Sequence, residues 1–205
     1  QRPKLYESLG MVYAANSINK MMEKLDIRLD AYDLYSCFPA AVKMFSRSLK
    51  LESEIAKTIT GSMPYAGGPL NSFVIHSTVK MIKKIRALEV RHGLVTGVSG
   101  MMTKQSFCVW GKEYQEQFIF DDVTDRAKLD ENPVELSNIV EGEGEIIGYT
   151  IIEVSENAPK AVLYLDDEKK HRKVVSSFDK NFINLLMEEE WVGKKVKFKD
   201  GQATL

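Results

Sequence analysis

The first half of the chain repeats apolar side chains with the period of a helix in three places. Residues 5–25, about 38–51 and 70–88 each carry apolar positions three or four residues apart among polar ones. This spacing predicts three amphipathic helices, each with one face buried against the rest of the fold. The second helix is expected to begin at Phe38-Pro39, because proline suits the first turn of a helix.

Short apolar runs between these helices predict strands at residues 31–36, 93–96 and 105–110. The segment GSMPYAGGP at residues 61–69 is rich in glycine and proline, so we expect a loop there. Residues 55–60 fit more than one class, and their structure stays open. The order helix, strand, helix, loop, helix, strand, strand indicates an α/β layer.

Strand signals dominate from residue 139 to the end of the sequence. Runs at 140–145, 146–154, 161–166, 173–176 and 195–198 have strand character, and residues 182–190 are a helix candidate. This pattern predicts a small β-barrel or β-sandwich, with the OB fold as one form of it. We therefore divide the chain into an α/β part at 1–112, a charged connector at 113–138 and a β-rich domain at 139–205.

Composition limits the class of protein. The 28 lysine and arginine residues nearly balance 29 acidic ones, so no overall field attracts nucleic acid or a membrane surface. The two cysteines are too few for a disulfide framework, and no Cys/His cluster has the spacing of a metal site. Without a signal-peptide pattern or a long apolar run, we expect a cytoplasmic protein with no membrane contact. The sequence has no initiator methionine, so we expect it to begin inside a longer chain.

Three segments carry a resemblance to a known family. DLYSCFP at residues 33–39 stands where thiolases carry an Asn-Glu-Ala-Phe box, or His-Asp-Cys-Phe in the sterol carrier thiolases. MPYAGGPLN at 63–71 stands where a working thiolase has Gly-His-Pro, and GLVTGVSG at 93–100 where it has Cys-x-Gly. EEWVGK at 189–194 is similar to the end of the extra C-terminal domain of the same proteins. The chain thus resembles the type 1 thiolase-like proteins, often named acetyl-CoA acetyltransferases.

The resemblance implies a fold and a substrate. It implies the C-terminal half of a layered α/β/α thiolase fold, followed by a small β-barrel or OB-like domain. The nucleophilic cysteine of the family lies in the other, N-terminal half, so Cys37 is not that nucleophile. The substrate would be a coenzyme A thioester in lipid metabolism, with no permanently bound cofactor or metal, and the protein would form a homodimer through the thiolase core. Without the N-terminal half, we expect apolar surface to be exposed on residues 11–22 or on the strand of Val95, where it would make the chain associate with itself.

Two departures from the family bear on the chemistry. By our alignment, Gly68 stands where the family has the histidine that helps activate the nucleophile. Gly97 stands where the family has the cysteine that moves the α-proton. Glycine has no side chain for either task, so Claisen condensation by the usual groups is not expected of this chain.

Four other residues are candidates for a catalytic role. Tyr35 and Ser36 lie in the box, and a phenol can donate a hydrogen bond to an oxyanion or move a proton. Cys37 precedes a helix, where the dipole would lower the pKa of a thiol. His76 lies two helical turns beyond the glycine loop. Three of the four also have a structural interpretation: a buried aromatic for Tyr35, a small apolar residue for Cys37 and a structural hydrogen-bonding residue for His76.

The glycine segments are candidates for binding the substrate. A glycine loop before a helix allows close approach of the backbone and presents N–H groups, which suit a thioester oxygen or a pantetheine amide. The same glycines are also consistent with two tight turns that bind no ligand. The residues we assign to substrate binding are Gly67, Gly68, Pro69, Asn71, Gly97, Ser99 and Gly100.

Three functions follow from this sequence. The first is an acyl-CoA acyltransferase of the thiolase type, or a thiolase-like aldolase, that needs the missing N-terminal half and is inactive without it. The second is a non-catalytic subunit that binds acyl-CoA or serves as a scaffold. The third is binding of single-stranded nucleic acid by the β-rich domain. We rank it last, because the lysines of that domain alternate with many acidic residues, whereas nucleic-acid-binding domains of this kind present a basic groove.

Overall fold

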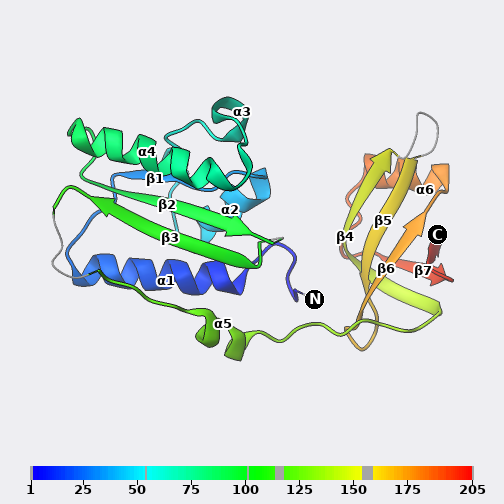
Figure 1. The fold of residues 1–205 in the computed structure, drawn as a ribbon. Coiled ribbons are helices and arrows are strands. Elements are labelled where there is room, and N and C mark those ends of the chain that lie inside the picture. Colours follow the sequence, from blue (N-terminus) through cyan, green and yellow to red (C-terminus); the bar gives the residue numbers. More distant parts are fainter. Residues whose placement is uncertain (1, 54, 101, 114–117, 154–158, 205) are drawn as a thin grey trace. The chain divides into compact units, whose positions relative to one another are not determined.

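The computed structural model comprises two compact units, which are described separately (Figure 1). It describes residues 2–53, 55–100, 102–113, 118–153 and 159–204. One unit, the α/β unit, comprises residues 6–131. The other is a barrel unit that joins residues 1–5 to residues 132–205. The chain therefore passes between the units twice.

A three-stranded sheet forms the centre of the α/β unit. The strands β1 (Ala31–Asp33), β2 (His92–Ser99) and β3 (Lys104–Gly111) lie in that order. β1 runs parallel to β2, and β2 runs antiparallel to β3. The carboxyl ends of β1 and β2 therefore meet at one edge of the sheet.

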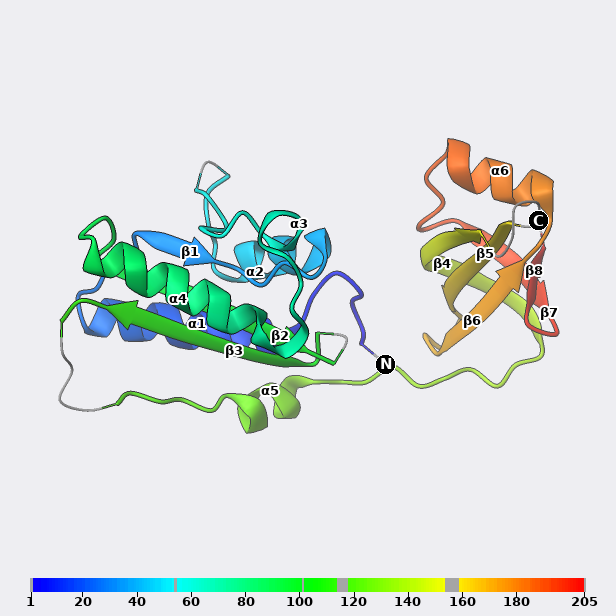
Figure 2. The same cartoon turned by 45° about the horizontal axis from the view of Figure 1, so that its top comes forward.

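Helices cover both faces of this sheet, as Figures 1 and 2 show. α1 (Leu9–Lys24) and α2 (Pro39–Ser48) share a core with Leu94, and α4 (Phe73–Arg86) shares one with Val95. These neighbours on β2 serve opposite cores because successive side chains of a strand point to opposite faces. The three amphipathic helices and the α/β layer predicted from the sequence are confirmed.

Several boundaries in the α/β unit differ from the prediction. β1 stops at Asp33 rather than at residue 36, and β2 continues past Gly97 to Ser99. The segment 61–69 is not loop throughout, because its prolines and glycines also frame a one-turn helix, α3 (Met63–Ala66). A 3₁₀ turn, η1 (Leu70–Ser72), precedes α4, and α5 (Thr124–Asp130) is a short helix near the end of the unit.

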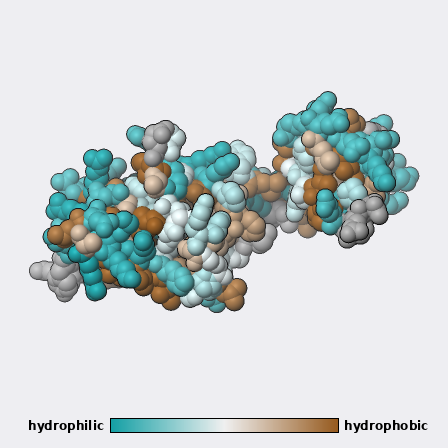
Figure 3. Space-filling view, turned by 90° about the horizontal axis from the view of Figure 1, so that it is seen from above, coloured by the Kyte–Doolittle hydropathy of each residue, from teal (hydrophilic) through white to brown (hydrophobic). Residues whose placement is uncertain are grey.

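The exposed apolar surface of this unit was predicted in the wrong place. Met11 and Met22 of α1 are buried, and so is Val95. α4 instead leaves Ile75 61% and Val79 46% exposed. The space-filling view from the side of α4 shows hydrophobic side chains between hydrophilic ones (Figure 3).

The second unit is a closed five-stranded barrel. Its strands follow the order β4-β5-β6-β8-β7, and β4 pairs with both β5 and β7 to close it. α6 (Lys180–Glu188) lies between β6 and β7 in the chain. This order with its single helix is that of an OB fold, so the small barrel predicted from the sequence is confirmed. The strand bounds are β4 (Glu141–Glu153), β5 (Pro159–Asp166), β6 (Arg172–Ser177), β7 (Lys195–Lys199) and β8 (Gln202–Thr204).

One long strand, β4, takes the place of the two predicted at 140–145 and 146–154. It changes partner near Glu145, and its register against β5 shifts between Ile146 and Gly148. Gly144 sits at this bend, where an added Cβ would lie 3.0 Å from the Leu165 Cβ. Glycine therefore lets β4 curve closely over β5.

Helix α6 packs its apolar face into the core of the barrel. Phe182, Ile183 and Leu186 are buried together with the inward side chains of the strands. The Asp179 carboxylate caps the helix by accepting hydrogen bonds from the amides of Asn181 and Phe182. The barrel thus has a core of its own, separate from the two cores of the α/β unit.

Candidate functional site

Asp33 organises the edge of the sheet where the family box lies. It is the last residue of β1, it is 1% exposed, and its carboxylate accepts four hydrogen bonds. Oδ2 accepts from the amides of Ile59 and Thr60 at 3.0 and 2.9 Å and from the Thr60 hydroxyl at 2.9 Å. Oδ1 accepts from the Ser77 hydroxyl at 2.7 Å. A buried carboxylate with this many donors fixes both the loop before α3 and the start of α4.

Tyr35 lies two residues beyond Asp33 and is half-buried. Its amide donates to the Thr96 Oγ1 at 2.9 Å, which ties the box to β2. Its ring meets Phe73 edge-on, with ring centroids 5.6 Å apart. Burial raises the pKa of the Tyr35 hydroxyl, and Cys37 adds to the rise. At neutral pH the phenol is therefore protonated and able to donate a hydrogen bond.

Ser36 is buried, and its hydroxyl oxygen accepts a hydrogen bond from the Met63 amide at 3.2 Å. This contact joins the box to the first residue of α3. The serine hydroxyl therefore holds the glycine loop near the end of β1, which is a positioning task rather than nucleophilic chemistry.

Cys37 is half-buried just before α2. Burial raises the pKa of its thiol, and the amides of Phe38 and Cys37 offset that rise only in part. The raised pKa favours the structural interpretation of Cys37 over a thiol activated by the helix dipole, because desolvation of the thiolate outweighs the nearby N–H groups. Cys37 is thus a protonated thiol at neutral pH, a poor nucleophile.

The glycine loop is exposed at Gly67 and Gly68. Gly67 has a φ of 80°, and its amide donates to the Met63 carbonyl at 2.9 Å, so this N–H is used to end α3. Gly68 differs: in the part of the chain that the structure describes, its amide donates to no other group. An added Cβ at Gly67 would meet nothing within 4 Å, so the loop leaves open space beside the backbone. Pro69 is half-buried, and Asn71 is exposed in η1.

Gly97 is buried in β2, beside the start of α4. An added Cβ there would lie 2.7 Å from the Ser106 Oγ and 3.4 Å from Val74 Cγ2. A cysteine at this position needs the serine to turn away, so the close packing explains the glycine. Ser99 ends β2 and Gly100 begins the turn to β3, and their carbonyls accept from the Thr103 amide at 3.2 and 3.0 Å.

His76 is exposed on α4. The buried residues of that helix include Phe73 and Ser77, and His76 lies outside their row. Among the residues described, no hydrogen bond or ion pair joins His76 to Tyr35, Ser36 or Cys37.

The arrangement suits substrate holding better than proton transfer. The box, the glycine loop and β2 are joined by hydrogen bonds, while the thiol and the imidazole lack the setting of catalytic groups. No cluster of three metal-binding side chains occurs among the residues described. A hollow of about 280 Å³ lies instead at the other end of α4, lined by Ile82, Ile85, Arg86, Leu88, Trp110, Gly111 and Lys112.

The sequence analysis missed Asp33, Thr60, Ser77 and Thr96. A signal existed for Asp33, because a charge within an otherwise apolar run predicts a buried group with partners. The other three have no local signal. Their hydroxyls come from segments distant in the chain, and only the fold brings them to the box.

Comparison with known proteins identifies the fold. No protein-family model matches the sequence, and neither does any curated protein sequence. Among solved structures, the chain is similar to a monomeric SCP2-thiolase-like protein type 1 from Mycobacterium smegmatis. The TM-score is 0.81 at 22% sequence identity, over 94% of this chain and 44% of that protein.

This protein has a thiolase-like fold. The similarity covers nearly the whole chain, and the chain also carries the small closed barrel described above. At this identity the comparison establishes the fold alone, and the chain spans less than half the length of the solved protein. None of the helices described is long and apolar enough to cross a lipid bilayer.

Proposed function

We propose that this thiolase-like chain is part of an acyl-CoA acyltransferase, in which it holds the substrate and another half supplies the nucleophile. The observation that carries the proposal is a set of hydrogen bonds at the carboxyl ends of β1 and β2: Ser36 binds the Met63 amide of the glycine segment, Asp33 binds the residues just before that segment, and the Tyr35 amide binds Thr96 of β2. Ligands of α/β sheets commonly bind at this edge.

Particular groups suit the parts of a thioester. The Gly68 amide, with no partner among the described residues, can donate to a carbonyl oxygen of the acyl group or of pantetheine. The Tyr35 phenol, protonated at neutral pH, can donate a second hydrogen bond. Coenzyme A thioester is then the substrate, with no permanently bound cofactor.

A non-catalytic acyl-CoA-binding or scaffold subunit is the second candidate. The raised pKa of the Cys37 thiol and the exposed position of His76 favour it, together with Gly68 and Gly97 at the positions of the family's acid–base groups. A thiolase-like aldolase is a variant of the first proposal, in which the Tyr35 phenol takes part in carbon–carbon cleavage.

The deciding experiment uses the full-length polypeptide that contains this chain. Calorimetry measures the binding of acetyl-CoA, and thiolysis and retro-aldol assays on the same sample measure turnover. Tyr35→Phe is compared with Tyr65→Phe, because Tyr65 lies in the same region but is 87% exposed.

Turnover that falls at least tenfold in Tyr35→Phe and is unchanged in Tyr65→Phe would support the enzyme. Tight binding without turnover in any variant would support the scaffold instead. Absence of binding by the full-length protein would exclude both proposals. The homodimer is proposed on the resemblance alone, and the solved neighbour is described as monomeric. The cytoplasmic location is proposed on the sequence features given above.

A further inference from the structure

Arg172, the first residue of β6, is an arginine buried in the barrel unit. Its side chain is only 1% exposed. Asp166, opposite it at the end of β5, balances the charge: Nε and Nη2 of Arg172 lie 3.0 and 3.3 Å from the two carboxylate oxygens. The pair occupies the outward face of the strands, because Leu165, next to Asp166, points into the core and successive side chains of a strand alternate between faces.

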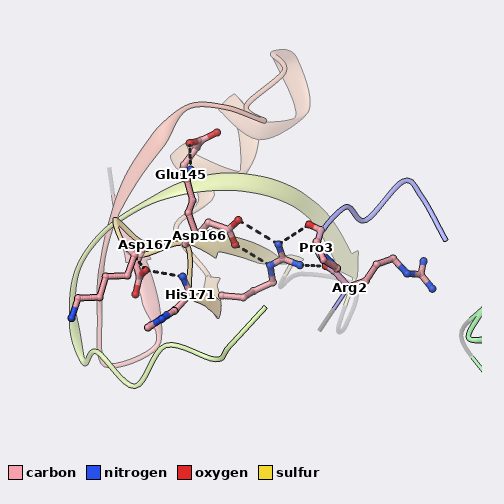
Figure 4. A network of polar contacts seen from close by, with 9 residues as sticks. Arg2, Pro3, Glu145, Asp166, Asp167 and His171 are labelled. Atoms are coloured by element: carbon pink, nitrogen blue, oxygen red, sulfur yellow. Dashed lines mark hydrogen bonds and ion pairs between the residues drawn. The ribbon is translucent and has the colours of Figure 1, made fainter. Parts of the chain in front are cut away.

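The same guanidinium also binds the segment at the start of the chain (Figure 4). Nη2 donates to the Pro3 carbonyl at 3.0 Å, and Nη1 donates to the Arg2 carbonyl. Both acceptors are main-chain atoms, so the contact binds an extended backbone whatever its side chains. Arginine suits this task because its planar group offers several donors in fixed directions.

The backbone of Arg172 binds a second passing segment. Its amide donates to the Glu135 carbonyl at 2.7 Å, and its carbonyl accepts from the Ser137 amide at 2.8 Å. Leu136 thereby pairs with Arg172 in a parallel bridge. This segment is the one by which the chain returns from the α/β unit.

The outer face of β4 accommodates the first segment by means of a glycine. An added Cβ at Gly148 would lie 3.0 Å from the Leu5 Cδ1. Gly148 pairs with Tyr164 on β5, whose side chain also points outward. Residues 2–5 therefore lie against the same outer surface that Arg172 and Asp166 occupy.

We propose that the outer face of β4, β5 and β6 is a peptide-binding surface, and that its ligand is the chain's own segment at residues 2–5. OB folds use the face of their second and third strands, here β5 and β6, to bind oligonucleotides and oligosaccharides. In this protein Arg172 fastens both passages of the chain, one before Tyr6 and one after Glu131. The barrel thereby binds the two segments of chain that lead into and out of residues 6–131.

The test measures release of the segment in the whole chain. Trypsin cleaves after Lys4 only when the segment leaves the barrel, and mass spectrometry reports the cleavage rate. Gly148→Val leaves Arg172 intact but places methyl groups where Leu5 lies, so cleavage should accelerate about tenfold or more. Arg172→Lys should act in the same direction, because an ammonium cannot reach Asp166 and both carbonyls together.

Two controls separate this effect from unfolding of the barrel. Thr150→Val keeps a β-branched side chain and replaces only its hydroxyl with a methyl group at an exposed position of the same strand, so it should leave the rate unchanged. Cleavage after Lys199 in β7 reports opening of the barrel itself. Faster cleavage at Lys4 with no change at Lys199 supports the proposal. It is overturned if Gly148→Val leaves Lys4 protected, if Thr150→Val has the same effect, or if cleavage at Lys199 rises in parallel.

Discussion

The Asp33 carboxylate accepts a 2.7 Å hydrogen bond from the Ser77 hydroxyl, which joins the end of β1 to the second turn of α4. Thr60 binds the other oxygen of the same carboxylate through its amide and its hydroxyl. One buried side chain thus fixes three separate segments around the box. The stability of the α/β unit should depend on it.

Asp33→Asn should lower the free energy of unfolding by about 2–4 kcal/mol. The asparagine side chain replaces one acceptor oxygen with an NH2 group, which is a donor, while the four surrounding groups are all donors. Ser77→Ala removes the hydrogen bond to Asp33 and a longer contact of 3.5 Å to the Phe73 carbonyl, and should cost about 1–2 kcal/mol. Urea denaturation followed by circular dichroism checks both values. Equal stability of Asp33→Asn and the unmodified protein would show that the network is not important for the fold.

Thr96 offers the second test of how the box is held. Thr96→Val keeps the shape of this 2% exposed side chain but removes the acceptor for the Tyr35 amide. A buried N–H without a partner should cost about 1–3 kcal/mol in denaturation experiments. Thr150→Val, at an exposed position of β4, is the matched control and should change stability by less than about 0.5 kcal/mol. The hydrogen bond is unimportant if the two variants behave alike.

The sequence predicts elements better than it predicts the contacts between them. α1, α2 and α4 could be predicted because each has a long apolar face with a helical period. β8 was missed, because a strand from Gln202 to Thr204 is too short to show a pattern and exists through its pairing with β7 and β6. The division of 139–205 into strands failed at β4 for a related reason: a glycine bend looks like a turn in the sequence.

The site follows the same rule. The box and the glycine loop were identified from their resemblance to thiolase motifs, and both lie at the sheet edge. The sequence left two interpretations of Cys37 open, and the structure favours the small half-buried residue over the activated thiol. The sequence could not decide between them, because a helix start is visible in a sequence and burial by distant segments is not. Thr60 and Ser77 reach Asp33 across 27 and 44 positions of sequence, a distance at which no local pattern exists.

Cys37 should react slowly with alkylating reagents near neutral pH. Burial raises the pKa of its thiol, and only the thiolate is a nucleophile, so the rate should rise at a higher pH than in an unfolded chain. The measurement follows iodoacetamide labelling against pH in a Cys108→Ser background, with the urea-unfolded protein as reference. Half-maximal labelling at or below the pH of that reference would contradict the buried thiol and restore Cys37 as a candidate nucleophile.

The exposed apolar residues of α4 predict where the chain associates with itself. Ile75→Gln combined with Val79→Gln should weaken any dimer seen by sedimentation velocity, because it removes apolar surface from the most exposed part of that helix. The free energy of unfolding should change by less than about 0.5 kcal/mol, since both side chains are exposed. Val174→Gln on the barrel, 48% exposed, is the control. An unchanged dimer in the α4 variant would place the contact elsewhere.

The turn between β5 and β6 makes the stability of the barrel depend on pH. Burial of the Asp167 carboxylate opposes its ionisation, but hydrogen bonds from the His171 amide, Ser137 and the Lys169 amide lower its pKa below the usual value. A carboxyl whose pKa is lowered by folding stabilises the native state above the pKa of the unfolded chain, about 3.9, and loses that contribution as the pH falls through the folded value.

Asp167→Asn should therefore destabilise the barrel most above about pH 5 and progressively less as the pH falls below about 4 and through the lowered pKa of Asp167, below which the unmodified carboxyl is also neutral. Urea unfolding followed by Trp191 fluorescence, at pH values from neutral to acidic, measures the difference between the two proteins. Asp200→Asn, exposed in the turn between β7 and β8, should keep the pH profile of the unmodified barrel. A difference between Asp167→Asn and the unmodified protein that stays constant with pH would mean that the asparagine disturbs packing and that the charge of Asp167 contributes nothing.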